Sequence, residues 1–261
     1  MFKNLLHLVL VLVVTACATH SESSGNAAWE DSLWGETSGV FQDSASKPLV
    51  TQASSHWYHH LFPGKQATIF KARQLDGRNA IEANAISSAS MLRRKVSVAA
   101  EDLGVVRFSW KVPALIAIAD MAQRDLDDSP VRIVLAFEGD RSKFSTKNAI
   151  LNELSLAVTG EEMPYAVMMY VWSKQRPLGT VINSPRTDRI RKLVVEADSE
   201  HLNQWQDYER NIKADFERLY GEPPGALLGM GIMTDTDNTH TTTQSWYGPL
   251  QVMMLAHPAE K

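Results

Sequence analysis

Alternation of apolar and polar residues with a period of two constrains the fold of this chain more than any other feature. In VVRFSWKV at 105–112, apolar residues alternate with Arg107, Ser109 and Lys111. The segment VRIVLAFE at 131–138 also places large apolar residues at every second position. A strand with one buried face produces this pattern because successive side chains point to opposite sides.

Nine segments have a strand-like composition: 67–73, 80–86, 91–98, 105–112, 131–138, 166–173, 190–197, 226–234 and 246–255. Turn residues separate most of them. Many short strands spaced in this way are typical of a β-sandwich or a barrel. The sequence therefore predicts a mostly β fold, an antiparallel β-sandwich, formed by a single domain over 29–261.

One segment departs from the strand pattern. Between Ser199 and Gly221 the apolar residues recur at helical spacing, and Glu209 precedes Lys213 by four positions, as in a helical ion pair. Gly221 followed by a Pro-Pro pair is a strong stop signal. We expect one amphipathic accessory helix at about 200–220. The stretch 141–157 reads as a long polar connection with partial helical character.

The amino terminus predicts export. Lys3 and a short apolar run precede Val14-Thr15-Ala16-Cys17, which is similar to a bacterial lipobox. We expect a lipoprotein signal peptide at 1–16, a lipid on Cys17 and a flexible tether at 17–28. The alternative is an ordinary signal peptide with an incidental cysteine. Ala18 does not resemble the aspartate that retains bacterial lipoproteins at the inner membrane, which implies an outer-membrane anchor facing the periplasm.

Charge and cysteine content exclude several classes of protein. The formal net charge is -4, whereas nucleic-acid binding proteins present basic patches. Cys17 is the single cysteine, so the chain has neither a disulfide nor a cysteine-ligated metal site. We expect the partners to be the membrane, through Cys17, and a glycan or an envelope protein.

The stretch MTDTDNTHTTTQSWYGP at 233–249 carries the densest set of candidate ligands. Asp235, Asp237 and Asn238 offer the oxygen ligands that calcium prefers, although the loop lacks the glycine and glutamate of an EF-hand. Asp127 and Asp128 precede another strand and would join them if the strand ends meet. The alternative is that these side chains cap turns. No cofactor follows from the sequence with certainty, and calcium is the candidate.

Four aromatic residues are candidate ligand contacts: Trp57, Trp172, Trp246 and Tyr247. An exposed indole ring on a sandwich face stacks on sugar rings, whereas a buried one contributes to the core.

The sequence contains no G-x-S-x-G motif, P-loop or G-x-G-x-x-G motif, so we assign no catalytic residues. Paired carboxylates need not be close in sequence, and Glu138, Glu161 and Asp188 are available to a hydrolase.

Five motifs resemble an uncharacterised bacterial family, domain-of-unknown-function family 3047: FSWKV, DDSPVRIVLAFEG, YVWS, RNIKADFERLYGEPP and MTDTDNTHTTTQSWYGPL. The resemblance implies a galactose-binding-like jelly roll and a secreted or lipid-anchored envelope protein, and it implies no activity. The family typically has an aspartate where this chain has Pro249, which weakens the case for a metal.

The leading functional prediction is a non-catalytic ligand-binding envelope lipoprotein that binds carbohydrate or another envelope polymer. The alternative is a structural or partner-binding lipoprotein. A hydrolase that uses carboxylates is third.

Overall fold

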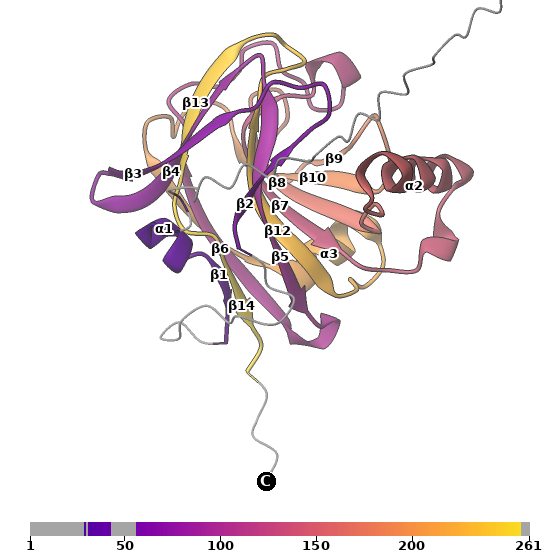
Figure 1. Cartoon of the computed structure of the whole chain (residues 1–261). Helices are drawn as coiled ribbons and strands as arrows, with labels where there is room; N and C mark the ends of the chain where they lie inside the picture. Colours follow the sequence, from indigo (N-terminus) through magenta and orange to yellow (C-terminus); the bar gives the residue numbers. More distant parts are fainter. Residues whose placement is uncertain (1–28, 30, 43–55, 257–261) are drawn as a thin grey trace, which may run out of the picture.

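The chain forms two seven-stranded sheets that pack face to face (Figure 1). The computed structural model describes residues 29, 31–42 and 56–256. The mostly β fold and its sandwich of two sheets confirm the predicted fold class. The predicted signal peptide, Cys17 and the tether lie outside the described residues. Among the helices in the described part, none is both long and apolar enough to cross a membrane.

Sheet A contains seven strands: β1 (Gly39–Phe41), β3 (Ile69–Leu75), β4 (Arg78–Ile86), β6 (Leu103–Lys111), β11 (Trp205–Asn211), β13 (Thr242–Tyr247) and β14 (Gln251–Met254). β6 is antiparallel to β11 along one edge and to β13 and β14, end to end, along the other. β4 then extends the sheet beside β13, and β3 beside β4. The parallel pairing of β1 with β14 is an exception to the antiparallel pattern.

Sheet B has the strand order β2-β5-β12-β7-β8-β10-β9. Its strands are β2 (Tyr58–Leu61), β5 (Ala89–Val98), β7 (Ser129–Phe137), β8 (Ala166–Ser173), β9 (Val181–Asn183), β10 (Ile190–Ala197) and β12 (Leu227–Asp235). All its pairs are antiparallel except β8 with β10. β12 and β7 therefore lie at the centre of the sheet, where both edges of each strand are hydrogen-bonded.

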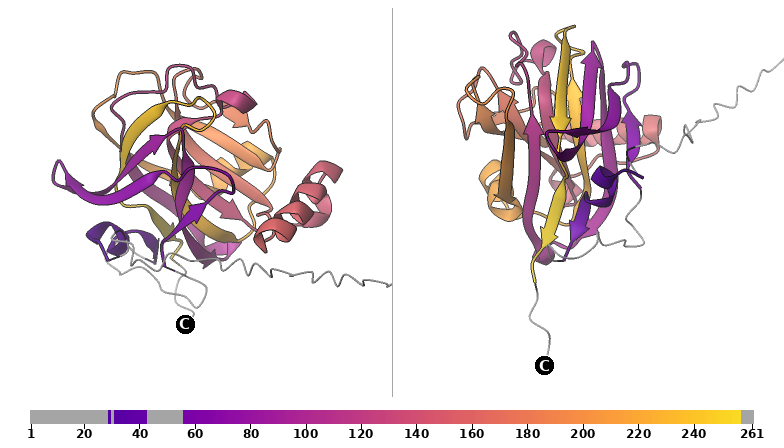
Figure 2. Two further views of the ribbon diagram at one scale, coloured as in Figure 1. Left: turned by 45° about the horizontal axis from the view of Figure 1, so that its top comes forward. Right: turned by 90° about the vertical axis from the view of Figure 1, so that its left-hand side faces the viewer.

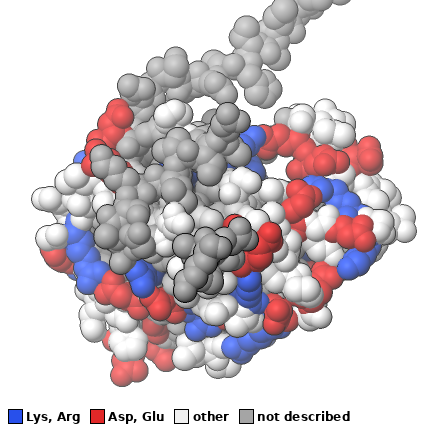
Figure 3. Space-filling view, turned by 90° about the horizontal axis from the view of Figure 1, so that it is seen from below, with Lys and Arg blue, Asp and Glu red and all other residues white. Residues whose placement is uncertain are grey.

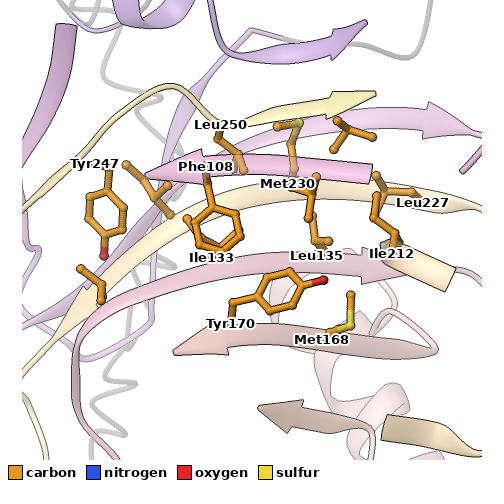
Figure 4. Packing of buried hydrophobic residues seen from close by; sticks show 14 of the residues in the cluster. Phe108, Ile133, Leu135, Met168, Tyr170, Ile212, Leu227, Met230, Tyr247 and Leu250 are labelled. Carbon is orange, nitrogen blue, oxygen red and sulfur yellow. The ribbon is translucent and has the colours of Figure 1, made fainter. Parts of the chain in front are cut away.

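The core lies between the two sheets (Figure 4). Phe108 of β6 stacks on Tyr170 of β8 with ring centroids 5.4 Å apart. Ile133 and Leu135 of β7 are 1% and 0% exposed and point toward the same layer. Each side chain of this size contributes about 1.5–3 kcal/mol of hydrophobic free energy when it is fully buried. The alternation predicted for 131–138 thus gives the inward face of β7.

The accessory helix is present but begins later than predicted. α3 spans Ile212–Tyr220, and the residues before it form β11. Asn211 ends the strand and caps the helix, since its side chain accepts from the N–H of Ala214 over 2.9 Å. Glu209, predicted to pair along a helix, instead forms an ion pair with Arg107 on the neighbouring strand at 2.6 Å. Strand pairing with β6 therefore overrides the helical spacing before residue 211.

The predicted strand 246–255 is divided into β13 and β14 by a short crossover at Gly248, Pro249 and Leu250. The carbonyl of Gly248 accepts from the indole nitrogen of Trp34 over 2.8 Å. The N–H of Gly248 donates to the carbonyl of Ser109 over 2.9 Å. Because Pro249 lies in the crossover and not within either strand, its missing N–H removes no hydrogen bond from the sheet.

Helix α2 (Thr146–Thr159) stands out at the side of the sandwich, next to β9 and β10 (Figures 1 and 2). Its polarity is inverted relative to most surface helices. Asn148 and Asn152 are buried at 1% and 8% exposure, whereas Ile150, Leu154 and Val158 are 63%, 57% and 58% exposed. Polar contacts therefore attach this helix to the sandwich. The other helical segments of the described chain are short: α1 (Leu33–Glu36) and the 3-10 turns Ala100–Asp102, Arg124–Leu126 and Arg141–Lys143.

Candidate functional site

The outer face of sheet B, away from the core, carries a pocket with a cavity volume of about 460 Å³. This volume lies within the range of small-molecule sites. The floor is formed by outward-facing residues of the central strands, which alternate with the core residues. They are Val134, Ala136, Val167, Met169, Gly229 and Gly231, with Met91 and Met233 beside them.

Two glycines of β12 deepen the floor. A Cβ at Gly231 would lie 2.7 Å from the backbone carbonyl of Leu92, so this position requires glycine for close strand packing. A Cβ at Gly229 would meet its neighbours at 3.5 Å or more, which is ordinary contact. Gly229 therefore leaves space that a side chain would fill. Neither glycine was predicted from the sequence as a site residue.

Connections close both ends of the pocket. At one end, the segment before β7 folds over the sheet, and Met121 packs with Val171, Ile182 and Val194. At the other end, the loop between α2 and β8 lies across the face, because Glu161 in this loop bonds to Lys95 of β5 over 2.5 Å. The pocket therefore suits a short ligand or a chain end.

The end beside Met121 contains a buried ionic cluster around Arg132 of β7, whose side chain is 3% exposed. Nε and Nη2 of Arg132 donate to the two carboxylate oxygens of Asp235, both over 2.8 Å. Nη2 also donates to the carboxylate of Asp127 over 3.1 Å. The register of β12 against β7 brings Asp235 close to Arg132, because Asp235 lies opposite Ser129 on the same strand as Arg132.

Lys192 of β10 adds a second buried cation, with a side chain that is 2% exposed. Its Nζ donates to both carboxylate oxygens of Asp127, over 2.6 and 2.7 Å, and to the carbonyl of Met121 over 3.0 Å. Asp127 therefore joins two cations from different strands. Such pairs are retained in a buried site because removing one partner leaves the other charge unpaired.

Burial shifts the pKa values within this cluster. Burial raises the pKa of Asp235 to about 7; Arg132 opposes this rise, and Asp128 and Asp127 add to it. Burial lowers the pKa of Lys192 to about 8, Arg132 lowers it further, and Asp127 opposes the change. For Asp127, burial is outweighed by Arg132 and Lys192, so its pKa lies below the ordinary value. For Arg132, burial is outweighed by Asp235 and Asp127, so its pKa lies above its already high ordinary value.

Asp128 holds the turn that follows β12. Its Oδ1 accepts from the side-chain amide of Asn238 over 2.9 Å, and its Oδ2 accepts from the N–H and the hydroxyl of Thr239, each over 2.6 Å. Asp237 in the same turn pairs with Lys65 at 2.5 Å. The loop at 233–249 thus forms internal contacts of the kind expected from turn-capping residues.

The carboxylates proposed for calcium do come together. Oxygen atoms of Asp128, Asp235 and Asp237 lie within 4.8 Å of one another, and Asp127 joins Asp235 through Arg132. All four already accept hydrogen bonds from protein donors. An ion would have to replace Lys65 at Asp237 and the turn amides at Asp128 to gain ligands there. The calcium site stays a prediction.

None of the four candidate aromatic residues lines the pocket. Trp57, Trp172 and Tyr247 are 3%, 1% and 0% exposed and belong to the core. Trp246 is half-buried on the outer face of sheet A, opposite Lys111, and hence on the other side of the sandwich. Asn238, by contrast, does line the pocket with Asp127, Asp235 and Asp237.

Neither cation of the buried cluster, Arg132 or Lys192, was predicted from the sequence as a site residue. Arg132 is the single charged residue of β7, whereas Lys192 follows Arg191 in a strand that also contains Glu196. The charge of Arg132, in the middle of an otherwise uncharged strand, was a signal in the sequence that this position has a special role. Of the carboxylates considered for hydrolysis, Glu161 lines the pocket, and Glu138 and Asp188 do not.

Fold and site together define a β-sandwich protein with a pocket on the outer face of one sheet. The chain belongs to the family described as Protein of unknown function (DUF3047), whose model matches residues 55–251. No curated protein matches it.

Two solved structures are similar to this chain over most of its length. The family 11 carbohydrate-binding module of cellulosomal cellulase Lic26A-Cel5E of Clostridium thermocellum has 9% identity and a TM-score of 0.34, with 78% of this chain and 91% of that chain covered. The xyloglucanase domain of NopAA, a type three effector from Sinorhizobium fredii in complex with cellobiose, has 6% identity and a TM-score of 0.39, with 79% and 96% covered. Scores at this level carry no information on ligand or activity.

Proposed function

We propose that this chain is a non-catalytic ligand-binding protein whose pocket on the outer face of sheet B takes a carbohydrate. The pocket itself is the observation that supports the proposal. Its floor is apolar, and one end presents carboxylate, amide and guanidinium groups. A saccharide has matching surfaces, since its C–H faces pack on apolar residues and its hydroxyls pair with polar side chains. A short ligand fits because both ends are closed.

A glycan array tests this function. The full chain, purified in detergent, should retain a subset of short saccharides, and titration calorimetry should give a 1:1 complex. Absence of binding across the array would contradict the carbohydrate proposal and favour the alternative of a protein partner.

A second candidate, carboxylate-based hydrolysis, is favoured by one observation. Asp235 and Asp127 lie in the pocket, and burial raises the pKa of Asp235 to about 7, a value suited to a general acid. Against it, Arg132 occupies both oxygens of Asp235. Release of new reducing ends from a bound saccharide during incubation would establish the hydrolase, and intact ligand would support binding alone.

We also propose that Cys17 anchors the protein in the cell envelope. The lipobox-like sequence Val14-Thr15-Ala16-Cys17 supports this location. After fractionation of cells that express the protein, the wild type should be found with membranes, and Cys17→Ser should lose the lipid and leave them. An unchanged membrane fraction and unchanged mass for Cys17→Ser would contradict the anchor.

A further inference from the structure

Two guanidinium groups at the charged end of the pocket have donors that no described residue uses. Arg132 lies at the base and Arg186, between β9 and β10, lies at the rim; both line the pocket. Asn238 connects their surroundings. Its side-chain amide donates to the carbonyl of Asp127, which Arg132 also contacts, and its carbonyl oxygen accepts from Arg186 over 3.1 Å.

The geometry of Arg132 leaves one nitrogen available. Nε and Nη2 form one edge of the planar guanidinium group, and this edge faces Asp235. Nη1 lies on the opposite side, and no residue of the described chain accepts a hydrogen bond from it. Nη1 is not among the fully buried polar atoms that lack a partner, so it stays accessible from the pocket. An acceptor on a ligand in the pocket would therefore reach it without displacing a protein group.

Arg186 differs from the other cations at this end. Arg132, Lys192 and Lys65 each form an ion pair with an aspartate. Among the described residues, Arg186 has no carboxylate partner, and its Nη2 bonds only to the neutral side chain of Asn238. Its charge is therefore not neutralised by a neighbouring acid.

The charges at this end sum to zero, so an anion would be attracted by Arg186, whose charge has no carboxylate partner among the described residues, and not by a net positive field. Four cations, Lys65, Arg132, Arg186 and Lys192, face four carboxylates, those of Asp127, Asp128, Asp235 and Asp237. Each of these carboxylates already accepts hydrogen bonds from other protein donors, and none accepts from Nη1 of Arg132. A small anion bound at Nη1 would therefore have no competitor among them. A dianion such as a phosphate ester would meet stronger repulsion from the four acids.

We propose that the pocket takes a saccharide with a carboxylate group, such as a uronic acid at a chain end, and that this carboxylate binds between Nη1 of Arg132 and Arg186. This inference rests on the proposed function and assigns its ligand class. The planar guanidinium group matches carboxylate geometry and gives charge-assisted hydrogen bonds. The sugar ring then lies on the floor toward Gly229.

Two pairs of disaccharides test the proposal, because the members of each pair differ mainly by the carboxylate. They are digalacturonate with α-1,4-galactobiose, and cellobiouronate with cellobiose. Titration calorimetry on the full chain in detergent should show at least one acid binding about tenfold more tightly than its neutral partner. Arg186→Gln should abolish this preference, so that acid and neutral sugar bind with equal affinity. Arg73→Gln, an exposed position on β3, is the matched control and should retain it.

The outcomes separate the two proposals. Equal affinity for acid and neutral sugar in the wild type, or a preference that survives Arg186→Gln, overturns the acidic-sugar inference and leaves carbohydrate binding in place. Binding of neither pair overturns the acidic-sugar inference, and absence of binding across the glycan array would overturn carbohydrate binding as well. Thermal melts of Arg186→Gln and Arg73→Gln verify that each variant is folded, so loss of the preference reports on the site.

Discussion

At the scale of single residues, the cluster at the pocket end depends on Arg132. Because Asp235 and Asp127 are almost fully buried, their charges need this guanidinium group. We expect Arg132→Met to lower the free energy of unfolding by about 3–5 kcal/mol at pH 8, as is typical when a buried pair is broken. Urea denaturation measures this loss.

The double variant Arg132→Met with Asp235→Asn is the matched control. It should recover part of the loss, since it removes one of the charges left unpaired. A cost below about 1 kcal/mol for Arg132→Met, the range of exposed ion pairs, would contradict the assignment.

The protonation of Asp235 gives a pH dependence. Its pKa is raised to about 7 in the folded protein from 3.8, so between these values the folded state holds more protons than the unfolded state. The free energy of unfolding of the wild type, relative to Asp235→Asn, should therefore fall as pH rises from about 4 to about 7 and level off above that range. Urea titrations at several pH values across this range measure the difference. A difference that rises or stays level with pH is inconsistent with the raised pKa.

Calcium would bind the carboxylates of Asp128, Asp235 and Asp237 if it bound at this end of the pocket. Asp237 already forms an ion pair with Lys65, and Asp128 already accepts a hydrogen bond from Asn238. We therefore expect equal melting temperatures with calcium and with chelator. An ion that binds the folded state alone would raise the midpoint. A rise in the wild type would show that the ion displaces these donors and would restore the site predicted from the sequence.

At the scale of elements, strand β12 sets the depth of the pocket through Gly229. Its Cβ would meet only ordinary contacts, so Gly229→Val should keep the fold while filling the floor. We expect at least a tenfold loss of saccharide affinity with the melting temperature unchanged or slightly raised, because glycine in a strand interior is unfavourable. Thr242→Val, at an exposed position of β13, is the control. Unchanged affinity in Gly229→Val would place the ligand elsewhere.

The elements also show what the sequence could predict. Alternation located the long strands well, since one face of each packs against the core, as in 131–138. It failed at Trp205–Asn211, where pairing with β6 wins over helical spacing, and at Gly248, where a crossover divides a predicted strand. Short strands such as β9 and β1 were missed, because three residues carry too little periodicity to be recognised.

At the scale of the whole molecule, the two acidic loops lie together, which the sequence left open as the condition for a shared calcium ion. Asp127 and Asp235 were visible in the sequence as loop acids. Their partners Arg132 and Lys192 come from β7 and β10, and only the strand order of sheet B brings them to one place. The aromatic candidates Trp57, Trp172 and Tyr247 are core residues because a sandwich buries large rings between its sheets.

Charged side chains of both signs are mixed on the surface. On the face shown in Figure 3, the described acidic and basic side chains are interspersed, in keeping with the formal net charge of -4. A nucleic-acid site would gather basic residues on one face. The expectation of a partner other than nucleic acid stays a prediction.

The central claim is that the outer face of sheet B is the ligand site, and methionine methyl groups report on it directly. Among the methionines that line the pocket, Met91, Met169 and Met233 lie at its floor, whereas Met168 lies in the core and Met253 in sheet A. A saccharide retained on the array should be titrated into the full chain labelled at its methionine methyls, with NMR as the readout. We predict that the three pocket signals shift and saturate together while Met168 and Met253 stay in place. If other signals shift and saturate while all three pocket methyl signals stay in place, the ligand binds elsewhere and the central claim is wrong.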